Sequence, residues 1–472
     1  MMSSEEMEYV QKLERTVAEQ AELIAELKER IEELERRLHM NSSNSSVPPS
    51  QDGFKRPKNR SLRQPSGNKP GGQQGHKGSG LKLPHKADTI ETCTPKECSN
   101  CPHASECVGH TVERRYKIEA EIELKVHEYD QMEYVCPLRD NSVIRGEFPK
   151  DITATKQYGN KLKALVIALN NEGAVSVNRI HDLLSALTSA SVSTGFIHNT
   201  IKDFSASLDS PLEYIKGSLL ASPILHGDET GLRANKALVW LHNASNNLFT
   251  YQDVSQKRGK AGIEEASVLP NYAGTLIHDC WRPYWTFIAV RHGICLAHIL
   301  RELKGILDNW PEQRWAKWLI DLFCEMKRVK ERLLAKGVEK ASRYYLQKFK
   351  SEWDLYIFSG KLHNPITYAK DGVGEKRNKA RCLVDRLEKY ADAAWLFFRD
   401  FNVPFDNNQA ERDVRPAKTK IKVSGCFRTL TGAKDFARIH SVLSTTKKHG
   451  QNIFTMILAL LEGHEFAPLL GY

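Results

Sequence analysis

The chain has 472 residues, with 68 lysines and arginines against 58 acidic residues and a formal net charge of +10. This length exceeds that of one ordinary domain, and the positive charge favours nucleic acid over a membrane surface as the partner. The sequence has no run of roughly 18 apolar residues and its N-terminal stretch is acidic, so it predicts neither a membrane span nor a signal peptide and favours a cytoplasmic protein.

A heptad pattern runs through residues 1–40. One apolar position recurs every seventh residue, at Val10, Val17, Ile24, Ile31 and Leu38, and the second is filled by Leu13, Gln20, Leu27 and Leu34. Such a narrow stripe, sustained over this length, is typical of a coiled coil. We therefore expect a homo-oligomer formed through this segment. The alternative is a single amphipathic helix that packs on the body of the protein.

Residues 41–87 are rich in Asn, Ser, Pro, Gly and Gln, and no acid lies between Asp52 and Asp88. A segment of this composition cannot bury a core and is expected to be disordered. Its basic residues would bind DNA phosphates without reading sequence. Those that we expect to bind DNA are Lys55, Arg56, Lys58, Arg60 and Arg63. The alternative is a solvated linker.

Residues 88–150 contain a Cys-x-x-Cys pair followed by two more distant cysteines. Thiolates on a tight turn suit a tetrahedral structural zinc, and the candidate ligands are Cys98, Cys101, Cys107 and Cys136. A second pair is incomplete because Arg139 stands where its other cysteine would be. The fourth ligand would then be Cys107, His103 or His110, and the alternative is a set of free buried thiols.

Residues 151–221 read as a helical domain. Ser176 and Ser193 are candidate N-caps of two successive helices. Two capped helices joined by a short turn are compatible with a helix-turn-helix, although plain helical domains show the same pattern.

Residues 222–304 change to the pattern of strands. We expect strands over Ile224–His226, Ala237–His242, Leu248–Tyr251 and Gly274–His278, with a helix over Gly262–Leu269. The first and last of these strands lead into Asp228 and Asp279. This order fits the first part of a ribonuclease-H-like α/β core. The fold class that we expect is a multidomain α+β protein.

A helical, basic insertion is expected over residues 305–400. Residues 401–439 then carry a catalytic helix with Glu411 and a basic strand region, and residues 440–472 form a closing helical segment. Basic residues that follow Glu411 could hold DNA phosphates, and these are Arg412, Arg415, Lys418, Lys420 and Lys422. Asn408, three residues before Glu411, could orient its carboxylate or contact the substrate.

Three acids at these positions suit phosphodiester chemistry. In-line attack on a phosphodiester is assisted by two hard cations about 4 Å apart, and Mg²⁺ or Mn²⁺ prefers carboxylate oxygens. We therefore expect Asp228, Asp279 and Glu411 to be the catalytic metal ligands. Each acid alone also has an ordinary role, as a turn residue, a helix cap or an ion-pair partner. Asp253 is a rival second acid, and Glu229 should point to the opposite face of its strand from Asp228.

Cys295 and His298 form a Cys-x-x-His pair before the insertion. Metal binding is one reading of this pair. We favour a packed helix face, because no second ligand pair is nearby in the sequence.

Four motifs carry a family resemblance: His226–Thr230, His278–Trp281, Cys295–Leu303 and Asn407–Arg412. With them, the heptads, the basic arm and the cysteine module, essentially the whole chain resembles the transposase of the bacterial insertion-sequence 66 family. The resemblance implies an Asp-Asp-Glu transposase that binds terminal repeats, cleaves DNA and joins 3′ ends to a target. It implies small accessory proteins as possible partners and a location on the nucleoid when bound to DNA. The cysteine module departs from the family, which usually shows two Cys-x-x-Cys pairs.

Two other functions stay open on the sequence. A DNA-binding remnant or regulator would keep the arm and the coiled coil without catalysis. A simple ribonuclease-H-like nuclease would cleave DNA without joining it.

Overall fold

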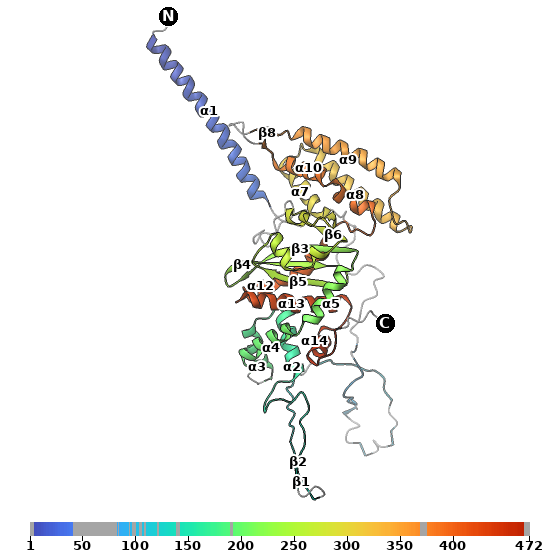
Figure 1. The fold of residues 1–472 in the computed structure, drawn as a ribbon. Coiled ribbons are helices and arrows are strands. Elements are labelled where there is room, and N and C mark those ends of the chain that lie inside the picture. The colour runs from blue at the N-terminus through green and yellow to red at the C-terminus, as the bar shows by residue number, and fades with distance from the viewer. Residues whose placement is uncertain are drawn as a thin grey trace. The chain divides into compact units, whose positions relative to one another are not determined.

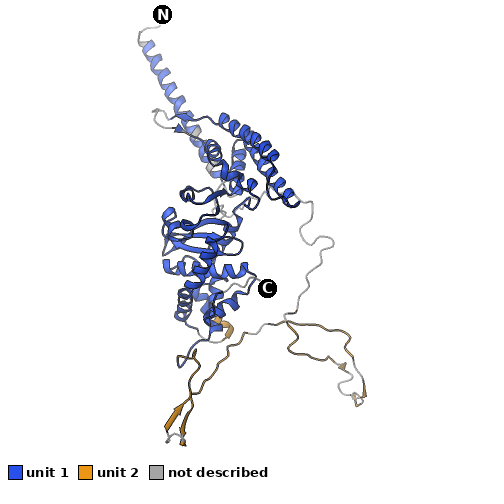
Figure 2. Ribbon diagram, turned by 45° about the vertical axis from the view of Figure 1, so that its right-hand side comes forward, with its two compact units in different colours: residues 1–60, 154–183, 191–472 blue, residues 61–153, 184–190 orange. Residues whose placement is uncertain are grey.

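The computed structural model describes residues 4–40, 83, 85–93, 95–96, 101–102, 106–107, 110–119, 122–137, 142–188, 192–368 and 375–466. The chain divides into two compact units (Figure 2). One holds residues 1–60, 154–183 and 191–472, and the other holds residues 61–153 and 184–190. The predicted DNA-binding residues of the arm lie outside the described residues, and these are Lys55, Arg56, Lys58, Arg60 and Arg63.

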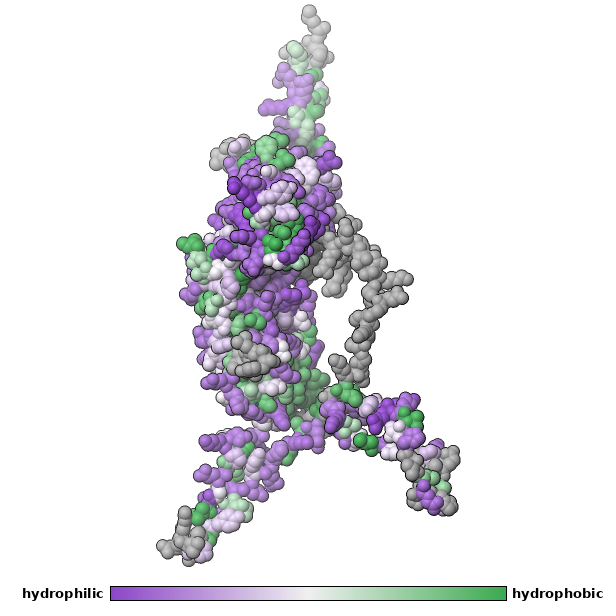
Figure 3. Space-filling view, turned by 90° about the vertical axis from the view of Figure 1, so that its right-hand side faces the viewer, coloured by the Kyte–Doolittle hydropathy of each residue, from purple (hydrophilic) through white to green (hydrophobic). Residues whose placement is uncertain are grey.

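Helix α1 (Ser4–His39) confirms that the heptad segment is helical. Its apolar stripe faces solvent in the single chain, with Val17 62% exposed and Leu38 84% exposed. Apolar and polar side chains are both visible on its surface (Figure 3). A stripe of this kind is buried when a second helix covers it. Self-association through α1 stays a prediction.

The second unit contains a small hairpin. Strand β1 (Glu133–Cys136) pairs antiparallel with β2 (Ser142–Arg145), and Arg145 bonds the Glu133 carboxylate at 2.6 Å. Cys101 and Cys107 are exposed, Cys98 lies outside the described residues, and so does the side chain of Cys136. The zinc site therefore stays a prediction.

A mixed five-stranded sheet forms the centre of the first unit. Its strands are β3 (Ile224–Ala234), β4 (Ala237–Ser245), β5 (Thr250–Ser255), β6 (Thr275–His278) and β7 (Arg291–Ile294), in the order β5-β4-β3-β6-β7. The first three strands pair antiparallel, while β6 and β7 run parallel to β3. Strand β3 continues eight residues beyond the predicted end at His226 and pairs with β4, so Asp228 lies within the strand and not at its end. Strand β7 was not predicted.

Two helices cover one face of this sheet, α12 (Asn408–Ser424) and α13 (Leu430–Lys448) (Figure 1). Val414 of α12 and Phe436 of α13 pack on Leu241 and Val254 of the strands. Helix α13 also protects the free edge of β5, because Thr445 and Ser441 accept hydrogen bonds from the backbone N–H groups of Thr250 and Gln252 at 3.1 and 2.8 Å. The predicted basic strand region is wrong for residues up to Ser424, which are helical.

Further helices that precede and follow the sheet in the chain complete the unit. Before it in the chain come α2 (Asn160–Asn171), α3 (Val177–Thr188), α4 (Thr194–Ala206) and α5 (Asp209–Leu220), and after it comes α14 (Ile453–Leu461). Ser193 caps α4 as predicted, since its hydroxyl accepts from the Phe196 N–H at 3.1 Å. A short helix α6 (Lys260–Glu265) and the 3-10 turns η5 (Leu269–Asn271) and η6 (Arg282–Thr286) join the strands.

The expected insertion consists of packed helices and a short hairpin. Its elements, with α7 at its start, are α7 (Leu296–Asn309), α8 (Arg314–Leu334), α9 (Arg343–His363), β8 (Thr367–Tyr368), β9 (Glu375–Lys376), α10 (Lys379–Lys389) and α11 (Ala391–Arg399). Their core includes Trp315, Phe323 and Trp395 and continues into the sheet through Ile277 and Ile294. Among the described residues, no helix combines the length and apolar character that would let it cross a membrane.

Lys330 in α8 is a buried lysine whose positive charge the fold disfavours. It is 8% exposed, and its Nζ donates to the carbonyl oxygens of Phe397 at 3.0 Å and Val403 at 2.6 Å. Burial lowers the pKa of Lys330 from 10.5 to about 8. Because the folded-state pKa lies below the unfolded value, the charged form costs stability below about pH 8, and that stability is recovered as the pH rises toward 10.5.

We predict that the free energy of unfolding of the wild type rises relative to that of Lys330→Met by about 3 kcal/mol between about pH 7 and about pH 10.5. Urea denaturation at a series of pH values measures this difference. Lys317→Met, at an exposed position of the same helix, should show little such change. A difference for Lys330→Met that does not vary with pH would contradict the assignment.

Candidate active site

Asp228 and Asp279 are placed by the parallel pairing of β3 with β6. The register pairs Leu225 with Leu276 and His226 with Ile277. Asp228 follows His226 by two residues and Asp279 follows Ile277 by two, so the same register continued along the chain sets the two aspartates opposite each other. Cys280, directly after Asp279, has a φ of 71°, a strained conformation for a side chain of this kind. The chain turns there, and the Trp281 N–H donates to Asp279 Oδ1 at 3.0 Å.

Glu411 lies in the first turn of α12, and Asn407 fixes that turn against β3. The Asn407 amide donates to the Gly227 carbonyl at 2.8 Å, and its Oδ1 accepts from His226 Nδ1 at 2.8 Å. The Glu411 N–H in turn donates to the Asn407 carbonyl at 3.2 Å. Asn407 is 1% exposed whereas Asn408 is exposed. It is therefore Asn407, and not the expected Asn408, that orients this part of the helix.

The three predicted acids influence one another electrostatically. Burial raises the pKa of Asp228 well above its usual value, and the negative charges of three neighbours raise it further, namely Glu229, Asp279 and Glu411. Burial also raises the pKa of Asp279. Carboxylates that are partly withdrawn from water and close to one another lack sufficient compensating charge. The structure thus brings together the acids that the sequence singled out.

Glu229 belongs to this acidic group, contrary to the expectation that it is uninvolved. Its carboxylate accepts hydrogen bonds from Tyr284 Oη at 2.7 Å and from Arg258 at 2.9 Å. Burial, and secondly the charge of Asp279, raises the pKa of Glu229 to about 7. Alternation along the strand predicts that Glu229 turns away from Asp228, yet the charge of Asp279 acts on Glu229. Nothing in the local sequence distinguishes Glu229 from an ordinary strand residue.

Arg258 is held by stacking as well as by its ion pair. Its guanidinium lies 4.6 Å from the Trp240 ring centroid and 4.3 Å from that of Trp281. Stacking between two indoles fixes the plane of the guanidinium and so the direction of its donors. Its charge lowers the pKa of both Glu229 and Asp279. Arg258 therefore supplies a cation to the acidic group.

Glu411 has a separate set of partners. Its Oε1 lies 3.4 Å from an Arg301 nitrogen and 3.8 Å from His298 Nδ1. Potential ligand atoms of Cys295, His298 and Glu411 all lie within 4.8 Å of one another. Among the described residues, these three form the group whose potential ligand atoms lie this close together. The potential ligand atoms of Asp228, Asp279 and Glu411 do not all lie within 4.8 Å of one another. Glu411 thus reaches the Cys-x-x-His pair from another helix, a proximity that spacing in the sequence does not reveal.

The predicted basic residues of α12 divide into two classes. Arg412, Arg415 and Lys422 are exposed. Lys418 is half-buried and donates to the Gly231 carbonyl at 3.0 Å, and Lys420 is buried with hydrogen bonds to the Asn170 and Val175 carbonyls. Only the exposed residues offer their charge to a large ligand. Lys420, which was expected to face DNA, instead joins α12 to the end of α2.

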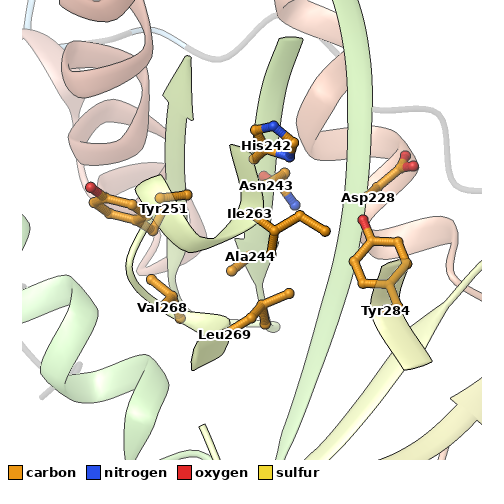
Figure 4. A pocket seen from close by; sticks show the side chains of 10 residues that line it. Asp228, His242, Asn243, Ala244, Tyr251, Ile263, Val268, Leu269 and Tyr284 are labelled. Atoms are coloured by element: carbon orange, nitrogen blue, oxygen red, sulfur yellow. The ribbon is translucent and has the colours of Figure 1, made fainter. Parts of the chain in front are cut away.

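A small cavity of about 10 Å³ lies on the other side of β3. Its lining is mostly apolar and includes Ile263, Val268 and Leu269, and the Asp228 carboxylate points away from these side chains (Figure 4). The cavity has room for about one water molecule. This cavity is therefore too small to be a substrate pocket.

A hard divalent cation fits the acidic group. The carboxylates of Asp228, Asp279 and Glu411 offer only oxygen atoms, which Mg²⁺ and Mn²⁺ prefer. Burial, and after it the charges of Glu229, Asp279 and Glu411, raise the pKa of Asp228, and such a cation would compensate that negative charge.

Residues 155–435 match the family described as Transposase IS66 family, and this match spans more than half of the chain. Residues 5–82 match a second family, described as Family of unknown function (DUF6444). No curated protein matches the chain. The first match contains the sheet, the helices from α2 to α12 and all three predicted acids.

We predict that Asn407→Ala lowers the free energy of unfolding by about 2–4 kcal/mol, because it leaves the Gly227 carbonyl and the His226 N–H buried without partners. Thermal and chemical denaturation measure the loss. Asn408→Ala changes the next, exposed residue and should alter stability by less than about 0.5 kcal/mol. Equal effects of the two substitutions would show that Asn407 does not fix the helix.

Proposed function

The chain belongs to the IS66 transposase family, and from this premise we propose that it is a DNA transposase that binds the terminal repeats of its element, cleaves there and transfers the 3′ ends to target DNA. The observation that carries the proposal is the approach of three acids from β3, β6 and α12, close enough for Asp279 and Glu411 to raise the pKa of Asp228. The strand order β5-β4-β3-β6-β7, with three antiparallel strands and two that run parallel to β3, supports a ribonuclease-H-like core.

Asp228, Asp279 and Glu411 would hold Mg²⁺ or Mn²⁺ in this proposal. The ion would polarise the scissile phosphate and assist both the attacking and the leaving oxygen. The chain's own contribution is to hold three carboxylates together in a partly buried setting. Asn407 and the β3–β6 pairing do this before substrate arrives, so little reorganisation is needed at the moment of reaction.

Basic residues around the acidic group would hold the DNA backbone. Arg412, which directly follows Glu411, and Arg415, one turn further along α12, are exposed, and arginine binds phosphate through paired donors. Lys418 is close enough for Asp228 to raise its pKa, although burial lowers it overall. We propose that Lys418 steadies β3 and that the two arginines contact DNA.

The proposal extends to the rest of the chain. The arm would add salt-dependent affinity for DNA, and α1 would join copies so that two DNA ends are held together. Cys98, Cys101, Cys107 and Cys136 would hold a structural zinc. Accessory proteins of the same element would be further partners.

We predict that Asp228→Asn, Asp279→Asn and Glu411→Gln each reduce Mg²⁺-dependent cleavage and strand transfer by at least about 100-fold, equivalent to about 2.7 kcal/mol of transition-state stabilisation. The assay uses terminal-repeat DNA and a target plasmid, and detects nicked and joined products. Filter binding should show that each variant still binds DNA.

Asp253→Asn is the matched control for this series. Asp253 lies on β5 of the same sheet and accepts from the Val254 N–H at 2.8 Å, and its acidic neighbour is Glu265 rather than the three acids. Activity that survives in Asp228→Asn and is lost in Asp253→Asn would reverse the assignment. Wild-type binding without metal-dependent nicking would favour a DNA-binding remnant, and nicking without joining would favour a simple nuclease.

A further inference from the structure

We infer that Cys295, His298 and Glu411 form a second metal site, selective for zinc or a similar borderline transition-metal ion. One potential ligand atom from each residue lies within 4.8 Å of the other two. His298 Nδ1 and Glu411 Oε1 are 3.8 Å apart. Ligands of a tetrahedral zinc ion lie roughly 3.3–3.6 Å from one another, so side-chain shifts of about 1 Å would complete the site.

The backbone around the three residues fixes the site in place. Cys295 is the N-cap of α7, and His298 lies in the first turn of that helix. The Leu296 N–H donates to the Phe405 carbonyl at 3.1 Å, and the Asn407 N–H donates to Cys295 Sγ at 3.1 Å. These two contacts join the start of α7 to the segment that leads into α12. The thiol, the imidazole and the carboxylate therefore meet where two helices begin.

His298 is the second, independent sign of a ligand. Its Nδ1 is buried, and among the described residues it has no hydrogen-bond partner. A buried polar atom without a partner costs about 1–3 kcal/mol and is rare in folded proteins. A metal ion bound by Nδ1 would satisfy it.

The ligand types separate this site from the all-carboxylate group. Thiolate, imidazole and carboxylate together suit zinc or cobalt, and Mg²⁺ does not bind thiolate or imidazole well. Burial raises the pKa of Cys295 to about 12, so binding of the ion would displace the thiol proton. Three protein ligands leave the fourth position open. Arg301 is 3.4 Å from Glu411 Oε1 and would have to turn to the other carboxylate oxygen.

Glu411 belongs to both groups of ligands. An ion held with Cys295 and His298 would occupy Glu411 Oε1 and would leave only the second carboxylate oxygen for a cation at Asp228 and Asp279. This consequence rests on the proposed function, and it makes zinc an inhibitor of Mg²⁺-dependent cleavage. The metal binding itself does not rest on catalysis, and it can be measured in the absence of DNA.

The test is a Co²⁺ titration of the full chain after metal removal with a chelator. The chain carries Cys98→Ser, Cys101→Ser, Cys107→Ser and Cys136→Ser, so that the predicted zinc module adds no signal. We expect one equivalent of Co²⁺ to produce thiolate-to-cobalt charge-transfer absorption and the visible bands of a tetrahedral ion. Zn²⁺ should displace the Co²⁺ and remove both bands, whereas Mg²⁺ should not.

Single substitutions in that background assign the ligands. Cys295→Ser should abolish the charge-transfer band. His298→Ala and Glu411→Gln should each weaken Co²⁺ binding. The loss should exceed the roughly 10–100-fold that removal of an outer-shell partner of a metal ligand costs. Cys324→Ser is the matched control, because Cys324 is a partly buried thiol in α8, and it should leave the titration unchanged. Circular dichroism confirms that each variant is folded.

Three results would overturn the inference. These are the absence of a charge-transfer band at saturating Co²⁺, a band that persists in folded Cys295→Ser, and equal losses in Cys295→Ser and Cys324→Ser. A chain that binds Co²⁺ as expected but cleaves no DNA would refute only the proposed function. A chain that cleaves DNA but binds no Co²⁺ would refute only the second site.

Discussion

The attachment of α12 to β3 is the contact on which the candidate site depends. Asn407 bonds His226 and the Gly227 carbonyl from one side chain, and both lie within two residues of Asp228. The same residue begins the helix that carries Glu411. The buried amide of Asn407 therefore sets the position of Glu411 relative to Asp228. Burial makes the contact costly to break, since each lost hydrogen bond would leave a polar atom unsatisfied.

Arginines offset part of the negative charge of the carboxylates that this contact gathers. Arg258 pairs with Glu229 and Arg301 with Glu411, while the charge of Arg386 lowers the pKa of Asp279. Arginine stays charged at any working pH, so it can hold an acidic cluster together until a cation enters. Arg301 is the important case, because the oxygen of Glu411 that it approaches is also near His298 and Cys295. The orientation of Glu411 decides which ligands it joins.

Local sequence patterns predicted the helices and most strands, and residue chemistry identified the three acids. The heptads gave α1, and the apolar runs gave β3 and β6, because these signals depend on neighbours in the sequence. The course of β3 past Asp228 was missed because its pairing with β4 overrides the turn residues Thr230 and Gly231. Glu229 and the trio of Cys295, His298 and Glu411 could not be found, since they depend on contacts between α12, β3 and α7 that no local pattern encodes.

The central claim is that Asp228, Asp279 and Glu411 share a divalent cation. Anomalous diffraction from crystals of the wild-type chain grown with Mn²⁺ tests it most directly. The account predicts an anomalous peak bounded by oxygen atoms of these three side chains, with Arg301 turned away from the metal. Mn²⁺ bound at other acids, with Glu411 still held by Arg301 and His298 at saturating metal, would contradict the account.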